Sequence, residues 1–483
     1  MRRFGVTAAL ILAALGSSAL ADTKGVKVTT DKTIDSSSLE SIIRDVVARS
    51  GAKTDDEKGI AIYEYLHNTI FHWAYPTEKS PQSVGPLKMI NVYGWGLCGG
   101  QHTVLKALYE TAGWECRYVG WPGHTTIEVK YGGQWHYYDV FLKCYYWSKD
   151  RSHVVSQEEI ANDPSIVLDA PKENRAARQN LCCGDEAKDV VAGCKARNVV
   201  GDSKGWASVT WRDENYSAAL NLSAGASLRL DWKAEPNGFA IDGKAPQHSC
   251  STKDIRDDRV LGPVLEHYGT RNWSDGAFTY APDFAKIPEV ADIELTGAAA
   301  KGGKLVASSG AGVAIFKVAL PYAYVTAAID AVFEGGEGKL SVSTDAGKSW
   351  KPAAAGDVSA LLRQKYDVRV KAEFPGTLAK FGVHAVVEHN RSALPYLVNG
   401  KNVVTVATEK NELPKDRVLV VTYSYQEATA PAERKRFDGQ GVSYGEVKTV
   451  RKEITSVPFT FEVQVGGNTP PKMISLERAL KAK

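Results

Sequence analysis

Apolar positions in the first quarter of the chain recur every three to four residues, which is the spacing of an amphipathic helix. From residue 35 to about residue 113 this pattern predicts mostly helix. Thr54 and Glu57 form a capping-box signature at the start of one helix. A second helix is predicted to begin at or just before Cys98 and to end near Gly113. The apolar face of the first of these helices consists of Ile60, Tyr63, Leu66 and Ile70.

The pattern changes to alternation after Gly113, which indicates strands. Three strands are predicted, over residues 115–119, 125–131 and 134–140. The pair Gly132-Gly133 between the last two is typical of a tight hairpin turn. Helices followed by a hairpin sheet predict one α+β domain over residues 22–150.

In the second half of the chain, apolar and polar residues alternate, which is typical of half-buried strands with one solvent-exposed face. Val368, Val370, Ala372 and Phe374 alternate with charged residues, and glycine, proline and asparagine turns separate such runs. We therefore expect all-β antiparallel sandwich modules, with a β-rich domain at 206–290 and a β-sandwich domain at 291–470. Residues 151–205 are polar and bear cysteines, which indicates an insert or linker, and residues 471–483 are expected to form a basic, frayed tail.

The first 21 residues resemble a secretory signal peptide of bacterial type. Arg2 and Arg3 precede an apolar run, and Ala19-Leu20-Ala21 is an A-x-A-like cleavage site. The mature protein is therefore expected to be secreted or periplasmic. No later apolar run is long enough to span a bilayer, so we expect no membrane span.

The charge of the chain gives no further functional class. The formal net charge is +3, with acidic and basic residues mixed along the chain, and no basic stripe is present. Nucleic-acid binding is therefore not expected.

The seven cysteines of this chain, which is expected to be exported, can be free thiols or disulfide partners. If Cys98 is a free nucleophile, six remain, enough for up to three disulfide bonds in an oxidising compartment. Bridges among Cys182, Cys183, Cys194 and Cys250 are favoured over a metal site because no C-x-x-C pair and no suitably spaced histidine accompany them. The pairing is left open.

Three residues have the chemistry of a nucleophilic site. Cys98 opens a predicted helix, where the helix N-terminus favours the thiolate. If Gly132 and Gly133 are the two loop residues, Asp139 falls on the same sheet face as His124, as a diagonal neighbour within side-chain reach. A thiol, an imidazole and a carboxylate in this order predict a Cys-His-Asp site acting through a thioester.

Two sequence motifs surround these three residues. In the first, Gly96-Leu97-Cys98 opens a helix that runs into Tyr-Glu-Thr-Ala-Gly-Trp-Glu-Cys-Arg-Tyr-Val at 109–119. The second is Gly-His-Thr-Thr-Ile-Glu-Val-Lys-Tyr-Gly-Gly-Gln-Trp at 123–135, followed by Tyr138-Asp139. On these motifs rests a resemblance of residues 60–146 to the transglutaminase-like superfamily, which has a papain-related fold. It implies that Cys98 is the nucleophile, that His124 is general base and acid, and that Asp139 orients His124.

The resemblance implies amide chemistry on a protein or peptide substrate, and this chemistry requires no cofactor or metal. Hydrolysis by a peptidase or amidase is favoured, transamidation is the second outcome, and a peptide glycanase would use the same triad. The competing hypothesis is an inactive scaffold whose β modules bind cell-surface polysaccharide or protein. Gly99, Gly100 and Thr126 depart from the family pattern and keep this alternative open.

The remaining residues of the site are less determined. Trp73, Trp95 and Gln101 are candidates for the second oxyanion donor, beside the Cys98 backbone N–H. His102 is interpreted as a helix-surface or supporting residue. His136, on the other face of its strand, is expected to be structural, as is the Asp-box-like run from Ser343 to Trp350. Tyr137, on the site face, is a candidate cleft residue.

Overall fold

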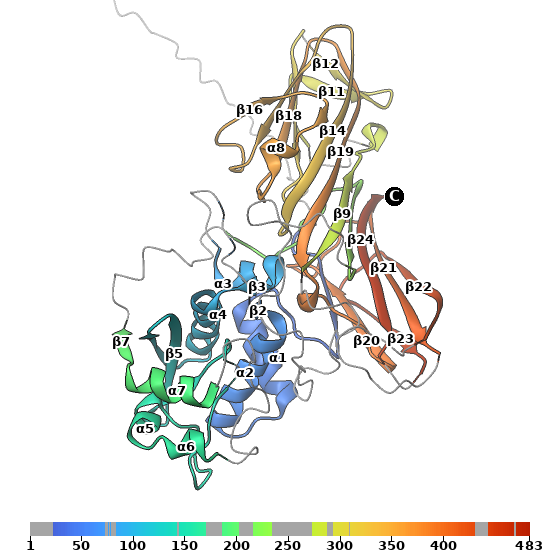
Figure 1. Cartoon of the computed structure of the whole chain (residues 1–483). Coiled ribbons are helices and arrows are strands. Elements are labelled where there is room, and N and C mark those ends of the chain that lie inside the picture. The colour runs from blue at the N-terminus through green and yellow to red at the C-terminus, as the bar shows by residue number, and fades with distance from the viewer. Residues whose placement is uncertain are drawn as a thin grey trace, which may run out of the picture.

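A computed structural model describes residues 23–72, 76, 78, 84–142, 144–170, 186–201, 216–233, 273–286, 293–308, 310–429, 443–467 and 470–483. The expected signal peptide lies outside these residues. Figure 1 shows a helix-rich part at the lower left, a β-rich part above it and a further set of strands at the right. Most of the described chain is antiparallel sheet with some helices, in several β-rich modules.

The helix-rich part begins as its sequence predicts. Thr54 caps α2 (Asp55–Thr69), and the Thr54 and Glu57 side chains each accept a backbone N–H in a complete capping box. The helix α4 (Cys98–Thr111) begins at the predicted cysteine. The other elements of this part are α1 (Leu39–Ser50), the two-residue strands β2 (Phe71–His72) and β3 (Trp95–Gly96), α3 (Pro86–Lys88) and the π-helical turn η1 (Met89–Tyr93).

A four-stranded antiparallel sheet packs beside these helices, in the order β6-β5-β4-β7. Its strands are β4 (Glu115–Trp121), β5 (His124–Tyr131), β6 (Gln134–Tyr138) and β7 (Asn198–Gly201). Tyr131 pairs with Gln134, so the predicted hairpin register is confirmed. Gly132 and Gly133 have φ of 58° and 82°, which a two-residue turn of this kind requires and other residues rarely adopt.

The described part of 151–205 differs from the expected insert or linker. It holds α5 (Gln157–Asn162), α6 (Ser165–Leu168) and α7 (Glu186–Lys195), and its strand β7 pairs with β4 as the fourth strand of the sheet. Val190 and Cys194 pack with Tyr137 in one buried cluster. The predicted boundary at residue 150 is therefore wrong, because apolar positions of a polar segment complete the same unit. Cys194 is a free, buried thiol, so no bridge forms there, and Cys182, Cys183 and Cys250 lie outside the described residues.

The β-rich part contains sheets of ten, five and three strands, all antiparallel. The large sheet follows the order β11-β12-β19-β9-β8-β24-β21-β22, and β14 pairs with β19 and β17. Its strands are β8 (Ala226–Asp231), β9 (Trp273–Tyr280), β11 (Ala298–Lys301), β12 (Lys304–Ala307), β14 (Ala323–Glu334), β17 (Gly356–Asp357), β19 (Thr377–Asn390), β21 (Arg417–Ala428), β22 (Tyr444–Ile454) and β24 (Lys472–Ala482).

The two smaller sheets join distant parts of the chain. One has the order β10-β13-β18-β15-β16, and the other places β20 between β1 and β23. Their strands are β1 (Lys27–Thr30), β10 (Ile293–Thr296), β13 (Gly312–Lys317), β15 (Lys339–Ser343), β16 (Lys351–Ala353), β18 (Arg369–Phe374), β20 (Gly400–Ala407) and β23 (Phe459–Val465). Short helices are η4 (Phe284–Lys286), α8 (Ser359–Leu362) and η5 (Arg391–Ala393). Because β9 pairs with β19, the boundary expected at residue 290 does not separate two sheets.

The predicted frayed tail at 471–483 is wrong. This segment is β24, which lies between β8 and β21 in the ten-stranded sheet. Met473, Leu476 and Leu480 belong to the buried core. Basic residues stand between these apolar positions, so the sequence does not show a clear strand pattern. A register shift in the pairing with β21 also interrupts the alternation of apolar and polar residues.

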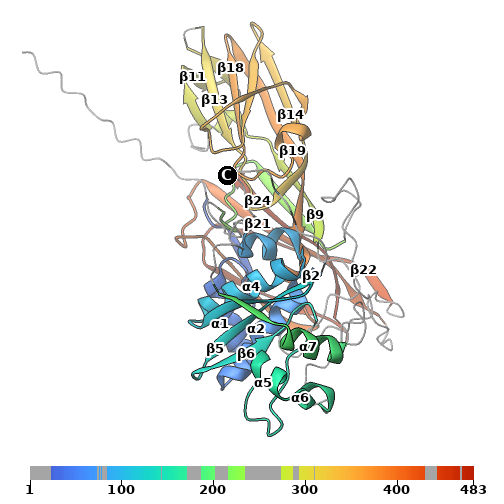
Figure 2. The ribbon, with the colours of Figure 1, turned by 60° about the vertical axis from the view of Figure 1, so that its left-hand side comes forward.

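The helix-rich part and the β-rich part share a core. Trp273, Ala323 and Val325 from the β-rich part pack in the cluster that holds the buried faces of α2 and α4. At the end of β19, Asn390 Nδ2 donates to the carbonyl oxygens of Thr69 and Ile90, at 3.0 and 2.7 Å. Figure 2 shows β9 and β19 running down to the helices.

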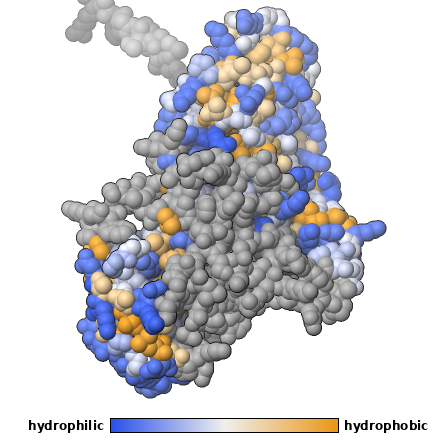
Figure 3. Space-filling model, in the orientation of Figure 1, coloured by the Kyte–Doolittle hydropathy of each residue, from blue (hydrophilic) through white to orange (hydrophobic). Residues whose placement is uncertain are grey.

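On the face seen in Figure 3, hydrophilic residues of the described chain are interrupted by separate apolar patches. Large apolar side chains that are well exposed among the described residues are Leu168, Val199, Val332 and Val447. Within the same residues, no helix has the length and apolar character needed to cross a bilayer.

Candidate active site

The N-terminus of α4 positions Cys98. Leu97 precedes the helix in an extended conformation, and the first helical residue is the cysteine. Gly96 is tightly enclosed, since a Cβ there would lie 3.1 Å from the sulfur of Met89. Cys98 itself is half-buried.

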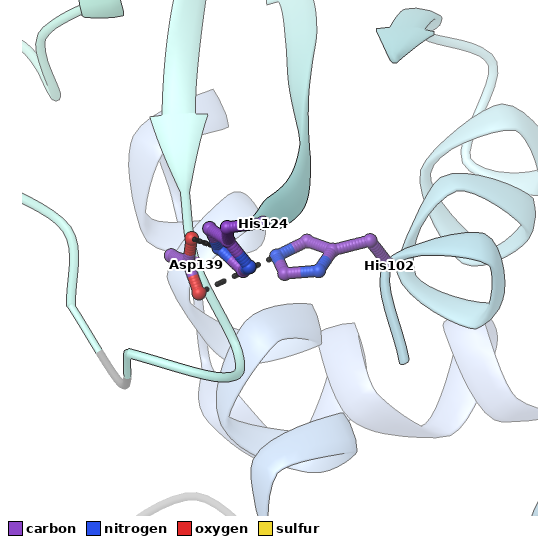
Figure 4. A group of neighbouring side chains, drawn as sticks. All are labelled: His102, His124 and Asp139. Atoms are coloured by element: carbon purple, nitrogen blue, oxygen red, sulfur yellow. Dashed lines mark hydrogen bonds and ion pairs between the residues drawn. The ribbon is translucent and has the colours of Figure 1, made fainter. Parts of the chain in front are cut away.

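The hairpin brings His124 and Asp139 together. His124 is the first residue of β5, and Asp139 directly follows β6. His124 Nε2 lies 2.6 Å from Asp139 Oδ2, as Figure 4 shows. Asp139 accepts only, so the imidazole donates this hydrogen bond, and Nδ1 remains for the thiol. The sequence predicted this contact from the hairpin register.

Asp139 is fixed by its surroundings. Its Oδ1 accepts the backbone N–H groups of Phe141 and Leu142, at 3.0 and 2.7 Å, and the Tyr137 hydroxyl donates to Oδ2 at 3.1 Å. The carboxylate has no exposed surface. Burial raises its pKa, but the charge and hydrogen bond of His124, together with these donors, hold the pKa of Asp139 well below its usual range. Asp139 is therefore ionised at any physiological pH.

The same contacts act on the imidazole and the thiol. Burial lowers the pKa of His124, but the Asp139 charge and hydrogen bond and the Cys98 thiol outweigh it and raise the pKa to about 10. Burial raises the pKa of Cys98, but the hydrogen bond and charge of His124 and the backbone N–H groups of Thr125 and Gly99 bring it below its ordinary value. These contacts stabilise the thiolate–imidazolium pair relative to the neutral thiol and imidazole.

His102 is part of this cluster rather than a helix-surface residue. It is completely buried, and its Nε2 lies 3.5 Å from Asp139 Oδ1 (Figure 4). Its Nδ1 is 2.8 Å from the Cys98 carbonyl oxygen one turn earlier, so Nδ1–H donates there. Burial above all, and the charge of His124, lower the pKa of His102 to about 4 despite the nearby Asp139. The signal in the sequence is its spacing of four residues from Cys98 on one helix face.

His102, His124 and Asp139 also form a group that could hold a metal ion, since one ligand atom from each lies within 4.8 Å of the others. In the arrangement described, His124 Nε2 and Asp139 Oδ2 are hydrogen-bonded to each other. A metal ion bound by these atoms would replace that hydrogen bond.

The candidate oxyanion donors differ in their environments. Trp73 lies outside the described residues. Gln101 is buried, and one of the two N–H groups of its amide donates to the Ile70 carbonyl oxygen at 3.2 Å. Trp95 is also buried, and its indole N–H has no hydrogen-bond partner among the described residues. Each of the two described candidates therefore keeps one unused N–H.

Aromatic side chains surround the imidazole. Trp121 and Phe141 lie 5.3 and 5.1 Å from His124 between ring centroids. Tyr137 is fully buried against Asp139 and does not line an open cleft. His136 stacks on Tyr131 at 3.6 Å and faces the Val154 carbonyl oxygen, on the other side of the strand from His124.

The Asp-box-like run braces a turn in the described structure. Asp345 accepts hydrogen bonds from the Ser343 hydroxyl and from the Ser349 backbone N–H, at 2.7 and 2.9 Å. These contacts fix the connection between β15 and β16. They are the structural contacts that the sequence predicted.

Comparison with known proteins gives no family. No family model matches the chain, and no curated protein matches it. A structure search finds the Endo-D glycoside hydrolase domain from Streptococcus pneumoniae R6, with 13% sequence identity and a TM-score of 0.13. The match covers 55% of this chain and 44% of the other. A score of this size does not establish a shared fold.

Proposed function

We propose that the chain is an exported, transglutaminase-like thiol enzyme with a papain-related N-terminal domain, acting on amide bonds of protein or peptide substrates. The observation that carries the proposal is the Asp139–His124 hydrogen bond of 2.6 Å beside a Cys98 thiol with a lowered pKa. A buried, fully hydrogen-bonded carboxylate that holds an imidazolium against a thiol is the arrangement that nucleophilic catalysis needs.

The proposed chemistry follows from the charge state. The Cys98 thiolate adds to the amide carbonyl carbon, and the carbonyl oxygen becomes an oxyanion facing the Cys98 backbone N–H. His124 gives its proton to the leaving amine as the C–N bond breaks, which leaves a thioester on Cys98. His124, now neutral, takes a proton from the incoming nucleophile, whose attack releases the acyl group and restores the thiolate.

The identity of the second nucleophile separates hydrolysis from transamidation. Water would give a peptidase or amidase, and an amine would give a cross-linked or modified protein. We favour water, because an exported enzyme works in a large excess of it. The β modules would then present the substrate or attach the enzyme to a surface polymer.

The first test is alkylation of the folded, non-reduced mature protein by iodoacetamide across pH, with peptide mapping. We expect Cys98 to react fastest, with an apparent pKa well under 8, and this pKa to rise in His124→Ala. Cys194 is the internal control, since burial raises the pKa of that thiol far above its ordinary value. A Cys98 that reacts like an ordinary thiol and does not respond to His124→Ala would contradict the proposal.

The second test separates the outcomes of the thioester. A glutamine-containing peptide is incubated with and without a primary amine, and the products are identified by mass. Release of ammonia or a cleaved peptide without amine supports hydrolysis, and amine incorporation supports transamidation. Both are expected to disappear in Cys98→Ser.

A further inference from the structure

A charged side chain stands in the apolar core of the large sheet. Arg478 lies in the middle of β24, opposite Leu228 of β8 and Val421 of β21, and both of these neighbours are completely buried. Arg478 is only 6% exposed. The residues two before and two after it on the strand, Leu476 and Leu480, belong to the core.

The guanidinium of Arg478 has N–H groups for which the described residues supply no acceptor. Nε and Nη2 of Arg478 are buried, and within the described residues they have neither a hydrogen-bond partner nor an ion-paired carboxylate. These two nitrogens form one edge of the guanidinium, the edge that binds a carboxylate or phosphate with two parallel hydrogen bonds. A buried charge without a counter-charge is costly, so a protein that keeps one usually supplies a partner from elsewhere.

Arg478 lines a cavity of about 490 Å³. The walls come from four separate stretches, within 25–37, 217–220, 393–395 and 407–411, and Asn91, Tyr322 and Asn390 complete the lining beside Arg478. This volume lies in the range of pockets that hold small organic ligands. The walls combine hydroxyl groups, such as those of Thr29, Thr33 and Ser37, with apolar side chains.

The acidic residues of the lining are already engaged or exposed. Asp35 pairs with Lys27 at 2.9 Å, and Glu409 is exposed at the rim. Neither neutralises Arg478. The charge of Arg478 also acts on His389. Burial lowers the pKa of His389 most, the charges of Arg478 and Arg391 lower it further, and the resulting pKa is about 3.

We propose that this cavity is a binding site for a small organic anion, whose carboxylate or phosphate group binds the Nε–Nη2 edge of Arg478. The remainder of the ligand would occupy the hydroxyl-lined space between the N-terminal segment and the β-rich part. This site is separate from the Cys98 cluster and does not depend on the proposed thiol chemistry.

The position of the cavity gives the ligand a structural effect. Ser36 donates to the Ala393 carbonyl oxygen at 3.1 Å, and Asn91 Nδ2 donates to the Ser36 carbonyl oxygen at 2.9 Å. These contacts join the N-terminal segment, the helix-rich part and η5, directly after β19, beside the cavity. An anion held there would therefore stabilise the junction against unfolding.

The test is the thermal unfolding midpoint of the mature protein in chloride, phosphate and acetate at constant pH and ionic strength. We expect phosphate or acetate to raise the midpoint by about 2 °C or more over chloride. In Arg478→Met this rise is expected to vanish, while the variant in chloride is at least as stable as the native protein, because an uncompensated buried charge has been removed. Arg451→Met, on exposed β22, is the matched control and should keep the full rise.

Titration calorimetry of the native protein with phosphate and with acetate gives an independent readout. Binding of phosphate alone identifies a phosphoryl group, binding of acetate alone a carboxylate, and binding of both the shared oxyanion chemistry. Arg478→Lys keeps the charge but loses the two-point geometry, so we expect about tenfold weaker binding. No saturable binding by the native protein, or an anion effect that survives in Arg478→Met, would overturn the proposal.

Discussion

At the scale of single residues, the site depends on Asp139 more than on any other side chain. It accepts four hydrogen bonds, from His124, Tyr137, Phe141 and Leu142, and His102 faces its other side. Each of these donors stabilises the ionised carboxylate, and the carboxylate in turn stabilises the imidazolium. Asp139 therefore influences the charge state of Cys98 indirectly, by stabilising the His124 imidazolium.

This arrangement predicts how stability varies with pH. The pKa of His124 is raised to about 10, so its contribution is fully present below about 6.5 and is lost as pH rises towards 10. The pKa of Asp139 is lowered, so its contribution is present above about 4 and is lost as pH falls below that value. We expect Asp139→Asn to lower the free energy of unfolding by about 3–5 kcal/mol between pH 4 and 6.5, and by progressively less up to pH 10.

Denaturant titrations of the native protein and Asp139→Asn at pH 5, 7 and 9.5 measure this difference. Asp189→Asn, an exposed carboxylate on α7, is the control and should change the free energy by less than about 0.5 kcal/mol at each pH. A loss of the same size at all three pH values would contradict the coupling to His124.

At the scale of elements, local signals in the sequence were sufficient for the hairpin and the two main helices. The capping box at Thr54 and the glycine pair at 132–133 each fix a backbone conformation within a few residues. The same local rules placed His124 and Asp139 on one face of the sheet as diagonal neighbours. They could not place His102, because whether that face of α4 is buried depends on the hairpin that packs against it. Nor could they place β7 or β24, whose partners are distant in the sequence.

The burial of β24 has a measurable consequence. Leu476 is completely buried in the core, so Leu476→Ala removes apolar contacts and leaves a cavity. We expect a loss of about 2–5 kcal/mol in the free energy of unfolding, measured by denaturant titration. Lys481→Ala, exposed on the same strand, should cost less than about 0.5 kcal/mol. Equal, small losses in both variants would mean that the segment is a tail after all.

At the scale of the whole molecule, the two halves of the chain are joined by buried polar contacts as well as by shared apolar core. Glu78, whose side chain is fully buried, pairs with Lys88 at 2.9 Å and accepts hydrogen bonds from Tyr93 and Tyr366, each at 2.6 Å. Tyr366 belongs to the β-rich part. Such contacts between distant segments leave no periodic trace in the sequence.

Asn390 offers a test of this coupling. Its amide donates to two buried carbonyl oxygens of the helix-rich part, so Asn390→Ala removes both of these hydrogen bonds. We expect the free energy of unfolding to fall by about 2–3 kcal/mol and the calorimetric transition to broaden or divide in two. Asn162→Ala, at the exposed end of α5, should leave a single transition unchanged. A single, sharp transition in Asn390→Ala would show that the junction does not depend on this residue.

The pairing of β1 with β20 bears on when the protein can finish folding. Lys27 pairs with Ala407, so one of the earliest strands to leave the ribosome finds its partner among the last. At about 5–20 residues per second, that partner arrives some tens of seconds later. Throughout this interval β1 lacks its partner strand, and a chaperone or a translocation channel can hold the chain before β20 pairs with it.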